Sequence, residues 1–350
     1  MSSAVRILRD APLRQRNTFG VAARAPLLAE VADPAALPEL LEAPGFRGCP
    51  LLVLGGGSNL LFVGDVEHPV IALSRREVTV VTQAGGGSDA TIVRADAGVS
   101  WHELVMQTLA LGLAGLENLA LIPGTVGAAP IQNIGAYGVE VRQFVHAVEA
   151  YEPATGLLQR LDPAQCEFGY RDSVFKRQPD RYIVTAVEFA LPRAGALMLD
   201  YAGLADELLA MGVDAPTPGS VAAAVIAIRR RKLPDPAVLG NAGSFFKNPV
   251  VPAALAASLA ARHPSLPVFR AADQPALRKL SAAWMIDSCG WKGHRDGDAG
   301  IAAAHALVLV NHGGATGQQL LDLARRVAGS VRDRFGVALE PEPRVFGASW

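Results

Sequence analysis

The 350-residue chain has few of the residues that mark secreted, metal-binding or nucleic-acid-binding proteins. Its three cysteines, Cys49, Cys166 and Cys289, lie far apart and form no CxxC pair. This odd, sparse count argues against a disulfide framework or a zinc ribbon. Acidic and basic residues nearly balance, at 33 and 32, so no excess of positive charge indicates nucleic acid or a membrane surface as a partner. We therefore expect a soluble protein of the reducing cytoplasm.

Long apolar runs, targeting signals and metal-ligand patterns are missing too. Residues 1–17 lack the apolar stretch of a secretory signal, and the run from Val221 to Ile228 is too short to cross a bilayer. The seven histidines show no HExxH or other ligand spacing, so we expect no metal. Half of the residues are hydrophobic, which is ample for a large core, and the length predicts two or three domains.

The 35 glycines and 24 prolines divide the chain into many short elements without a regular βαβ rhythm, which predicts an α+β fold. Caps and hydrophobic periodicity predict helices from about 101 to 111, with a capping box of Ser100 and Glu103, and at 218–232, 253–262, 282–289 and 317–335. Strands are expected at 50–54, 91–97, 144–151, 182–191 and 303–310, with a last extended segment at 337–346. A loop-like stretch at 192–198 predicts a domain boundary.

The first glycine-rich turn, Gly55-Gly56-Gly57-Ser58-Asn59, follows an expected buried strand. Its backbone N–H groups can converge on an anion without side-chain obstruction. It is not a dinucleotide fingerprint, because GxGxxG requires a glycine where Leu60 stands, and no GK[ST] of a P-loop follows. Taken alone, the turn could equally be a tight surface turn.

The second glycine-rich segment, residues 121–138, contains Gly124, Gly127, Gly135 and Gly138 but no charged residue. Such a segment makes a poor surface loop and a good wall for a flat or phosphate-bearing ligand. Together, the two segments predict a diphosphate-bearing cofactor held on Gly55–Asn59 and on Pro123–Gly127.

Two strings place a reactive side chain in an unusual setting. Arg171 lies among aromatic residues in GYRDSVFK, where a guanidinium can grip a carboxylate in a bidentate manner; a surface pair between Arg171 and Asp172 is the alternative. Ser244 follows a glycine in NAGSFFKNP, where it can donate a proton or attack. No GxSxG elbow surrounds it, so hydrolase chemistry has no support, and a turn serine is the alternative.

A third string, LEPEPR at 339–344, places Glu340 and Glu342 two residues apart. In an extended segment both carboxylates point to the same face. Pairing with Arg344 is the structural alternative.

Taken in order, these strings resemble the UDP-N-acetylenolpyruvoylglucosamine reductase family of FAD enzymes, which complete UDP-N-acetylmuramic acid for peptidoglycan. The resemblance runs from NTFG at 17–20 through LGGGSNLLF, IPGTVGAAPIQNIGAYG, FGYRDSVFK and NAGSFFKNP to LEPEPR. The length and the stretch around Tyr201 look like the longer branch of the family, in which a tyrosine loop folds over the substrate.

The resemblance implies an FAD-binding domain of the vanillyl-alcohol-oxidase type, made of two α+β subdomains, at residues 17–193. A smaller α+β substrate domain is expected at 194–350, with the strand at 337–346 returning toward the flavin. It also implies non-covalent FAD, NADPH as co-substrate, a UDP-sugar with an enolpyruvyl ether as substrate, a monomer, and a role in cell-wall synthesis, cell shape and cell division.

Site residues are carried over by the same match. Arg171, assisted by Glu342, is expected to stabilise the charge that hydride transfer leaves beside the substrate carboxylate, and Ser244 to deliver the proton to C2. Cofactor contacts are expected from Gly55, Gly56, Gly57, Ser58, Asn59, Pro123, Gly124, Gly127, Ile131, Asn133, Gly135 and Arg344. Substrate contacts are expected from Tyr170, Tyr201, Lys232, Asn248 and His305.

Two departures and two alternatives stand beside this match. Ala128 and Ala129 carry no hydroxyl for the cofactor, and Pro343 removes a backbone donor beside Glu342. The alternatives are another FAD oxidoreductase on the same scaffold and a non-catalytic protein that binds a nucleotide sugar or flavin.

Overall fold

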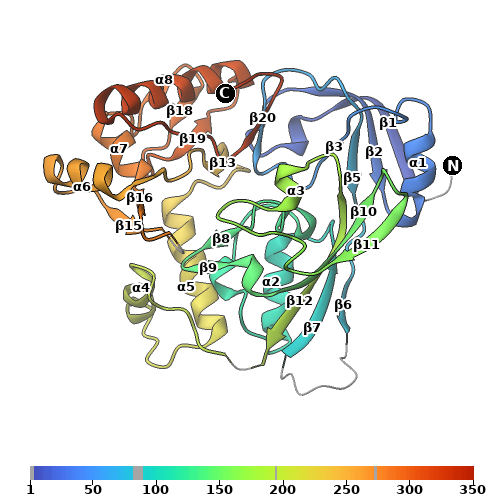
Figure 1. The fold of residues 1–350 in the computed structure, drawn as a ribbon, viewed down its shortest axis with the longest axis horizontal. Coiled ribbons are helices and arrows are strands. Elements are labelled where there is room, and N and C mark those ends of the chain that lie inside the picture. The colour runs from blue at the N-terminus through green and yellow to red at the C-terminus, as the bar shows by residue number, and fades with distance from the viewer. Residues whose placement is uncertain (1–3, 82–89, 194, 272–273) are drawn as a thin grey trace. The chain divides into compact units, whose positions relative to one another are not determined.

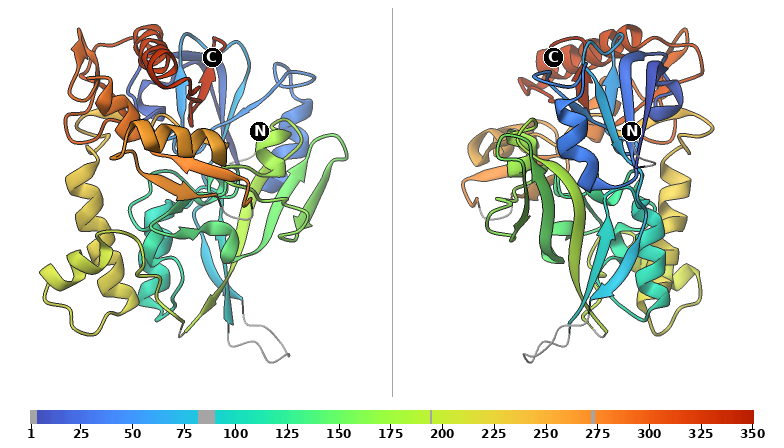
Figure 2. Two further views of the ribbon diagram at one scale, coloured as in Figure 1. Left: turned by 60° about the vertical axis from the view of Figure 1, so that its left-hand side comes forward. Right: turned by 90° about the vertical axis from the view of Figure 1, so that its right-hand side faces the viewer.

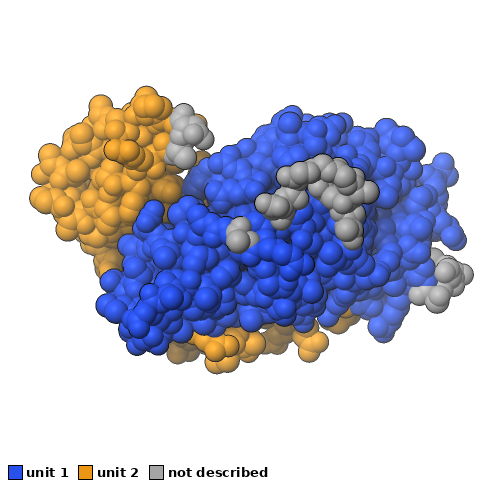
Figure 3. Space-filling model, turned by 90° about the horizontal axis from the view of Figure 1, so that it is seen from below, with its two compact units in different colours: residues 1–11, 25–56, 67–229 blue, residues 12–24, 57–66, 230–350 orange. Residues whose placement is uncertain are grey.

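A computed structural model describes residues 4–81, 90–193, 195–271 and 274–350. Helices and strands mix throughout this part of the chain, which confirms the α+β prediction (Figure 1). The chain forms two compact units: unit 1 comprises residues 1–11, 25–56 and 67–229, and unit 2 comprises 12–24, 57–66 and 230–350 (Figure 3). The division into cofactor and substrate domains at 193/194 stays a prediction, and residue 194 itself lies outside the described residues.

The first sheet of unit 1 has the strand order β1-β2-β5-β3 and carries α1 (Leu37–Glu42). Its strands are β1 (Val5–Pro12), β2 (Arg24–Val31), β5 (Val70–Leu73) and β3 (Leu52–Val53). β5 pairs in parallel with both β2 and β3. Leu37, Phe46 and Ile71 are among the buried residues of its core. β3 is shorter than the predicted strand at 50–54 and ends two residues before the first glycine turn.

The second sheet of unit 1 is antiparallel, in the order β11-β10-β12-β7-β6 (Figure 1). Its strands are β6 (Val78–Val81), β7 (Ala90–Asp96), β10 (Val145–Glu152), β11 (Leu157–Leu161) and β12 (Ile183–Pro192). The strands predicted at 91–97, 144–151 and 182–191 are confirmed to within one residue at each end.

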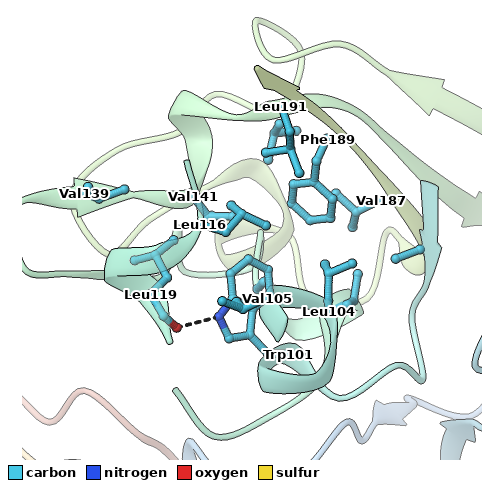
Figure 4. Close-up of a cluster of buried hydrophobic side chains, with 14 of the residues drawn as sticks. Trp101, Leu104, Val105, Leu116, Leu119, Val139, Val141, Val187, Phe189 and Leu191 are labelled. Atoms are coloured by element: carbon cyan, nitrogen blue, oxygen red, sulfur yellow. Dashed lines mark hydrogen bonds between the residues drawn. The ribbon is translucent and has the colours of Figure 1, made fainter. Parts of the chain in front are cut away.

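The core of this second half of unit 1 forms around Trp101 (Figure 4). Its indole N–H donates to the carbonyl oxygen of Leu119 at 2.9 Å, and its ring meets Phe189 edge to face. The helices of this region are α2 (Trp101–Ala110), α3 (Val174–Arg177), α4 (Leu204–Ala210) and α5 (Pro218–Lys232), the last extending into unit 2. A small hairpin pairs β8 (Gly135–Ala136) with β9 (Val139–Glu140).

The capping box predicted for α2 is wrong, although the helix is present. Ser100 takes the N-cap position, but its side chain makes no capping hydrogen bond. Instead the backbone N–H of Trp101 donates to the carbonyl oxygen of Gly124 at 3.1 Å, and Ser100 forms a β-bridge with Thr125. The second glycine segment thus replaces the local cap. By contrast, α5 has a local cap, since Thr217 Oγ1 accepts from the N–H of Ser220 at 3.1 Å.

The described residues of unit 2 form three small sheets. The largest has the order β13-β19-β18-β17, with β13 (Gly240–Ser244), β19 (Val308–Asn311), β18 (Ala299–Ile301) and β17 (Arg295–Asp296). The second consists of β14 (Val250–Pro252), β16 (Leu277–Leu280) and β15 (Val268–Arg270). In the third, β4 (Leu60–Phe62) pairs in parallel with β20 (Arg344–Phe346).

Three helices complete unit 2: α6 (Ala253–Arg262), α7 (Ala282–Ser288) and α8 (Gly317–Phe335). α8 packs on β18, β19 and α7. In Figure 2, α8 is the red helix near the top of each view. The predicted ends of α6 and α8 match. Ser281 caps α7, since its Oγ accepts from the N–H of Trp284 at 3.2 Å. The strand predicted at 303–310 begins only at Val308, because the residues before it form a turn in which the N–H of Val308 donates to His305.

In the described part of the chain, no helix is long and apolar enough to cross a membrane.

Candidate functional site

Within unit 1, Gly55 and Gly56 of the first glycine-rich turn lie directly against the second turn. A Cβ atom on Gly56 would come within 2.9 Å of the Gly124 Cα, and one on Gly55 within 2.6 Å of Thr125 Oγ1. Real Cβ atoms do not approach backbone that closely, so this packing requires glycine at position 56. The structure therefore brings together two segments that are about seventy residues apart and that sequence patterns alone singled out.

These two turns offer backbone donors. Among the described residues, the N–H groups of Gly55, Gly56 and Gly124 donate no hydrogen bond within the protein, and none of the three glycines is buried. Unsatisfied amide donors on successive glycines are suited to the oxygens of an anion such as a diphosphate. The turns therefore fit a diphosphate-bearing cofactor.

The second turn is anchored to the end of β7. The N–H groups of Val126 and Gly127 donate to the carbonyl oxygens of Val99 and Ala97 at 2.9 and 3.0 Å, and a Cβ on Gly127 would lie 2.5 Å from that of Ala97. Ala129 is buried, and Ala128 Cβ lies 3.4 Å from the position of a Gly55 Cβ. Small residues at 128 and 129 thus serve the packing of the turns.

Three hydrogen bonds fasten the arginine string to the second glycine segment. Ser173 Oγ donates to Ile131 O at 2.5 Å, Asn133 Nδ2 donates to Gly169 O at 2.9 Å, and Arg171 Nη2 donates to Gly135 O at 2.8 Å. Asn133 is fully buried, and its amide also bonds Glu140 and the N–H of Arg142. A contact of Asn133 with the cofactor stays a prediction.

Arg171 has a constrained backbone and a partly buried side chain. Its φ of +54° lies in the left-handed region, inside a tight turn where Gly169 pairs with Asp172. Its guanidinium carbon lies 5.6 Å from the centre of the Tyr170 ring, and Lys176 Nζ donates to its carbonyl oxygen at 2.8 Å. The carboxylate of Asp172 pairs with Arg177 rather than with Arg171. The arginine head is therefore held beside the second glycine segment.

Ser244 ends β13 in unit 2, opposite Val308. The pairing is irregular between Asn241 and Ser244, and Gly243 in between has a φ of +68°. Asn241 fixes this irregularity, because its Oδ1 accepts from the N–H of Gly243 at 2.9 Å. Phe245 is fully buried directly after the serine. The half-buried hydroxyl thus stands on a rigid bend rather than on a free turn.

Glu342 lies beside the serine bend. Its N–H donates to Phe245 O at 2.7 Å, and Phe246 forms a bridge with Pro341. Its carbonyl oxygen accepts from Asn59 Nδ2 at 3.4 Å, so the structure brings Ser244, Glu342 and the end of the first glycine turn into one part of unit 2. The neighbouring Glu340 is separate, since it pairs with Lys247 at 3.0 Å.

Arg344 begins β20, and Pro343 directly precedes that strand. The N–H of Arg344 donates to Asn59 O at 3.0 Å, and its guanidinium lies 4.5 Å from the centre of the Phe346 ring. Glu342 and Arg344, on either side of the buried Pro343, donate backbone hydrogen bonds to Phe245 O and Asn59 O. The segment is therefore held although Pro343 has no N–H to donate.

The residues predicted to meet the substrate are distributed over both units. In unit 1, Tyr170 and Tyr201 expose nearly half of their side chains. In unit 2, Lys232 ends α5, and Asn248 Oδ1 accepts from the N–H of Ala282 at 3.0 Å at the start of α7. His305 accepts from the N–H of Leu307, and burial, followed by the charges of Lys232 and Lys292, lowers its pKa. This imidazole is therefore neutral at neutral pH.

Sequence patterns missed three residues that hold this region. Leu121, with a φ of +58°, precedes the second glycine turn; its N–H donates to His102 Nδ1 at 3.1 Å and its carbonyl oxygen accepts from Arg229 Nε at 3.2 Å. Burial lowers the pKa of the Arg229 guanidinium. Asn118 makes two further contacts described below. Leu121 belongs to the second glycine-rich segment, but the three supporting residues, His102, Arg229 and Asn118, lie outside both glycine-rich segments and act through contacts with residues distant in the sequence.

Comparison with known proteins bears on this geometry. Residues 25–162 match the family model of an FAD binding domain, and residues 235–346 match that of the UDP-N-acetylenolpyruvoylglucosamine reductase C-terminal domain. The two matches together, with the packed glycine turns, define the class: an FAD-binding oxidoreductase with a reductase-type C-terminal domain.

Whole-chain relatives narrow this class. The chain is 59% identical to a UDP-N-acetylenolpyruvoylglucosamine reductase of Xanthomonas campestris pv. campestris (strain 8004), with 98% of this chain and 97% of the relative covered. It is 57% identical to that of Xylella fastidiosa (strain M12), over 97% and 96%. A crystal structure of the reductase from Thermus caldophilus aligns with a TM-score of 0.65 at 27% identity, over 97% and 98% of the two chains. The chain belongs to the UDP-N-acetylenolpyruvoylglucosamine reductase family.

Proposed function

We propose that this chain reduces the enolpyruvyl ether of UDP-N-acetylenolpyruvoylglucosamine, with NADPH as the source of electrons, to give UDP-N-acetylmuramate for peptidoglycan synthesis. The observation that carries this proposal is the 59% identity, over nearly the whole of both chains, to a relative that bears the reductase name. Two local observations support it: Arg171 is held in a fixed position within unit 1, and Ser244 and Glu342 lie close together within unit 2. We also expect a monomer located in the cytoplasm.

The glycine turns of unit 1 are proposed to hold the diphosphate of FAD. Their free N–H groups supply donors without adding charge, and the close approach of Gly56 to Gly124 keeps side chains out of that space. When bound, FAD supplies the hydride for the reduction. No histidine or cysteine lies in either glycine segment, so we propose that the cofactor is held without a covalent bond.

Arg171 is proposed to stabilise the charge that forms next to the substrate carboxylate. Hydride addition to the terminal alkene carbon leaves negative charge that spreads onto the carboxylate oxygens. A cation fixed beside those oxygens before the reaction lowers the barrier, because it need not reorganise. The bond from Arg171 to Gly135, the left-handed turn and the contact with Tyr170 hold the guanidinium in this way.

Ser244 is proposed to deliver the proton to C2, and Glu342 is proposed to act on the carboxylate end of the substrate. A hydroxyl is a weak acid, so its position must be well fixed. The bend set by Asn241 and Gly243, and the buried Phe245 that follows, provide this fixed position. Tyr201, Lys232, Asn248 and His305 are proposed to bind the rest of the nucleotide sugar.

One assay separates this proposal from its alternatives. The purified protein is expected to be yellow and to oxidise NADPH only when the enolpyruvyl sugar nucleotide is added. NADPH oxidation at a rate that does not depend on the sugar nucleotide would indicate a different flavin oxidoreductase. Binding of the sugar nucleotide without any NADPH oxidation would indicate a non-catalytic binding protein. Either result would contradict the proposed function.

A further inference from the structure

The stretch from Leu197 to Tyr201, which we call the tyrosine segment, has no regular secondary structure. It is nevertheless fastened to the second glycine segment within unit 1. The ring of Tyr201 meets the ring of Tyr137 edge to face at 5.0 Å. Met198 lies over the following residue, since a Cβ on Gly138 would come within 3.2 Å of Met198 Cγ.

A single buried side chain joins the two segments. Asn118 is 1% exposed, and its amide nitrogen donates to the carbonyl oxygens of both Tyr137 and Met198, each at 2.9 Å. Two carbonyl acceptors can be met only by N–H groups, so this orientation of the amide is fixed by its partners. Among the described residues, the remaining oxygen of Asn118 has no hydrogen-bond partner.

That unpartnered oxygen indicates what the residue is for. A buried acceptor without a partner costs free energy, so the side chain gives up one hydrogen bond in order to make the two that link Tyr137 to Met198. Tyr137 is itself held with a φ of +48°, a constrained conformation for a residue other than glycine. Through Asn118, the backbone at Met198, three residues before Tyr201, is held in a fixed position relative to the backbone at Tyr137.

We propose that Asn118 is a positioning residue that holds Tyr201 for the substrate: it ties the tyrosine segment to the glycine segment and so sets the affinity for the nucleotide sugar. The proposal rests on the proposed function for the identity of that substrate. Asn118 touches neither cofactor nor substrate in this account. Tyr201 itself is nearly half exposed, and its ring packs on that of Tyr137.

The first test measures the linkage without any substrate. In limited digestion by chymotrypsin, Leu197, Leu199 and Tyr201 provide cleavage sites inside the tyrosine segment. Cleavage of a segment tracks how often it detaches locally. Asn118→Asp keeps the shape but removes both donors, so we expect cleavage there to be about five to ten times faster, with other sites unchanged.

A second variant guards against failure of Asn118→Asp to fold. Met198→Ala removes the contact with Gly138 from a side chain that is 39% exposed, so the fold should tolerate it, and cleavage should again be faster within the segment. Met211→Ala, a methionine of similar exposure at the end of α4, is the matched control and should cleave at the parental rate.

The second test is the kinetic pattern. If Asn118 positions Tyr201, its variant raises KM for the enolpyruvyl sugar nucleotide about tenfold and changes kcat by less than about twofold, because the reacting groups are untouched. Parental cleavage rates in Asn118→Asp or, where that variant does not fold, in Met198→Ala would overturn the linkage. Faster cleavage throughout the chain would show that Asn118 serves the stability of the whole fold. Loss of kcat with an unchanged KM would show that Asn118 affects the reaction step instead of substrate binding. Either result would overturn the proposal. A parent enzyme without turnover would contradict the proposed function but leave the digestion result to decide the linkage.

Discussion

At the scale of single residues, the account depends most on the serine that ends β13. Replacing Ser244 with alanine removes one hydroxyl from a bend that Asn241 and Gly243 continue to hold. We expect turnover to fall about 100-fold or more while the flavin spectrum and the melting temperature stay at parental values. Steady-state NADPH oxidation measures this, with the exposed Ser265→Ala as control. Full activity of Ser244→Ala would contradict the assignment of Ser244 as the proton donor.

A second residue-scale prediction concerns the contact between the glycine turns. Gly56→Ala places a methyl group 2.9 Å from the Gly124 backbone, so one turn must move, at a cost on the order of 1–3 kcal/mol. We expect weaker FAD binding, measured as the dissociation constant from flavin fluorescence. Gly64→Ala is the control, because a Cβ at this exposed position meets nothing within 4 Å. Equal FAD affinity in the two variants would contradict the proposal that the packed glycine turns hold the FAD diphosphate.

At the scale of elements, helix ends separate what local sequence decides from what it does not. α8 begins with a capping box in which Thr316 and Gln319 bond each other's backbone N–H groups, whereas the box predicted at Ser100 does not form. Thr316→Ala should therefore cost about 1 kcal/mol of unfolding free energy, and Ser100→Ala about 0.5 kcal/mol or less. Urea denaturation followed by circular dichroism compares the two. A larger loss of unfolding free energy for Ser100→Ala than for Thr316→Ala would contradict the finding that Thr316 caps its helix and Ser100 does not.

The same contrast explains how much of the fold the sequence could predict. The ends of α5, α6 and α8 follow from prolines, caps and periodicity within a few residues, and these signals are local. Strand pairing is not local: β4 finds its partner in β20, nearly the whole chain away. The first sheet, with β1, β2 and β5, went unpredicted except for β3, and the strand at 303–310 was placed too early, because distant partners decide where such strands begin.

The candidate site divides in the same way. Glycine-rich and charge-free strings marked the cofactor turns, and the family resemblance pointed to Arg171, Ser244 and Glu342. Their supports could not be predicted, since Asn118, His102 and Arg229 act through contacts with residues distant in sequence or through backbone carbonyls. Such residues carry no pattern of their own.

At the scale of the whole molecule, burial of one thiol gives stability a pH dependence. Burial raises the pKa of Cys166 in the folded chain to about 12, above its ordinary value of 9.0. Since the folded value is the higher one, the thiol stabilises the fold fully below pH 9, and this contribution is lost between about pH 9 and 12. Urea midpoints should fall more steeply over this range for the parent than for Cys166→Ala. Parallel curves would contradict the prediction.

In the proposed function, the whole molecule holds a flavin on two packed glycine turns and reduces an enolpyruvyl sugar nucleotide. The most direct measurement is mass spectrometry of the product after the purified protein has been mixed with NADPH and UDP-N-acetylenolpyruvoylglucosamine. The account predicts a product heavier than the substrate by the mass of dihydrogen, formed in equal amount to the NADPH consumed. Unchanged sugar nucleotide in the presence of bound FAD and NADPH would contradict it.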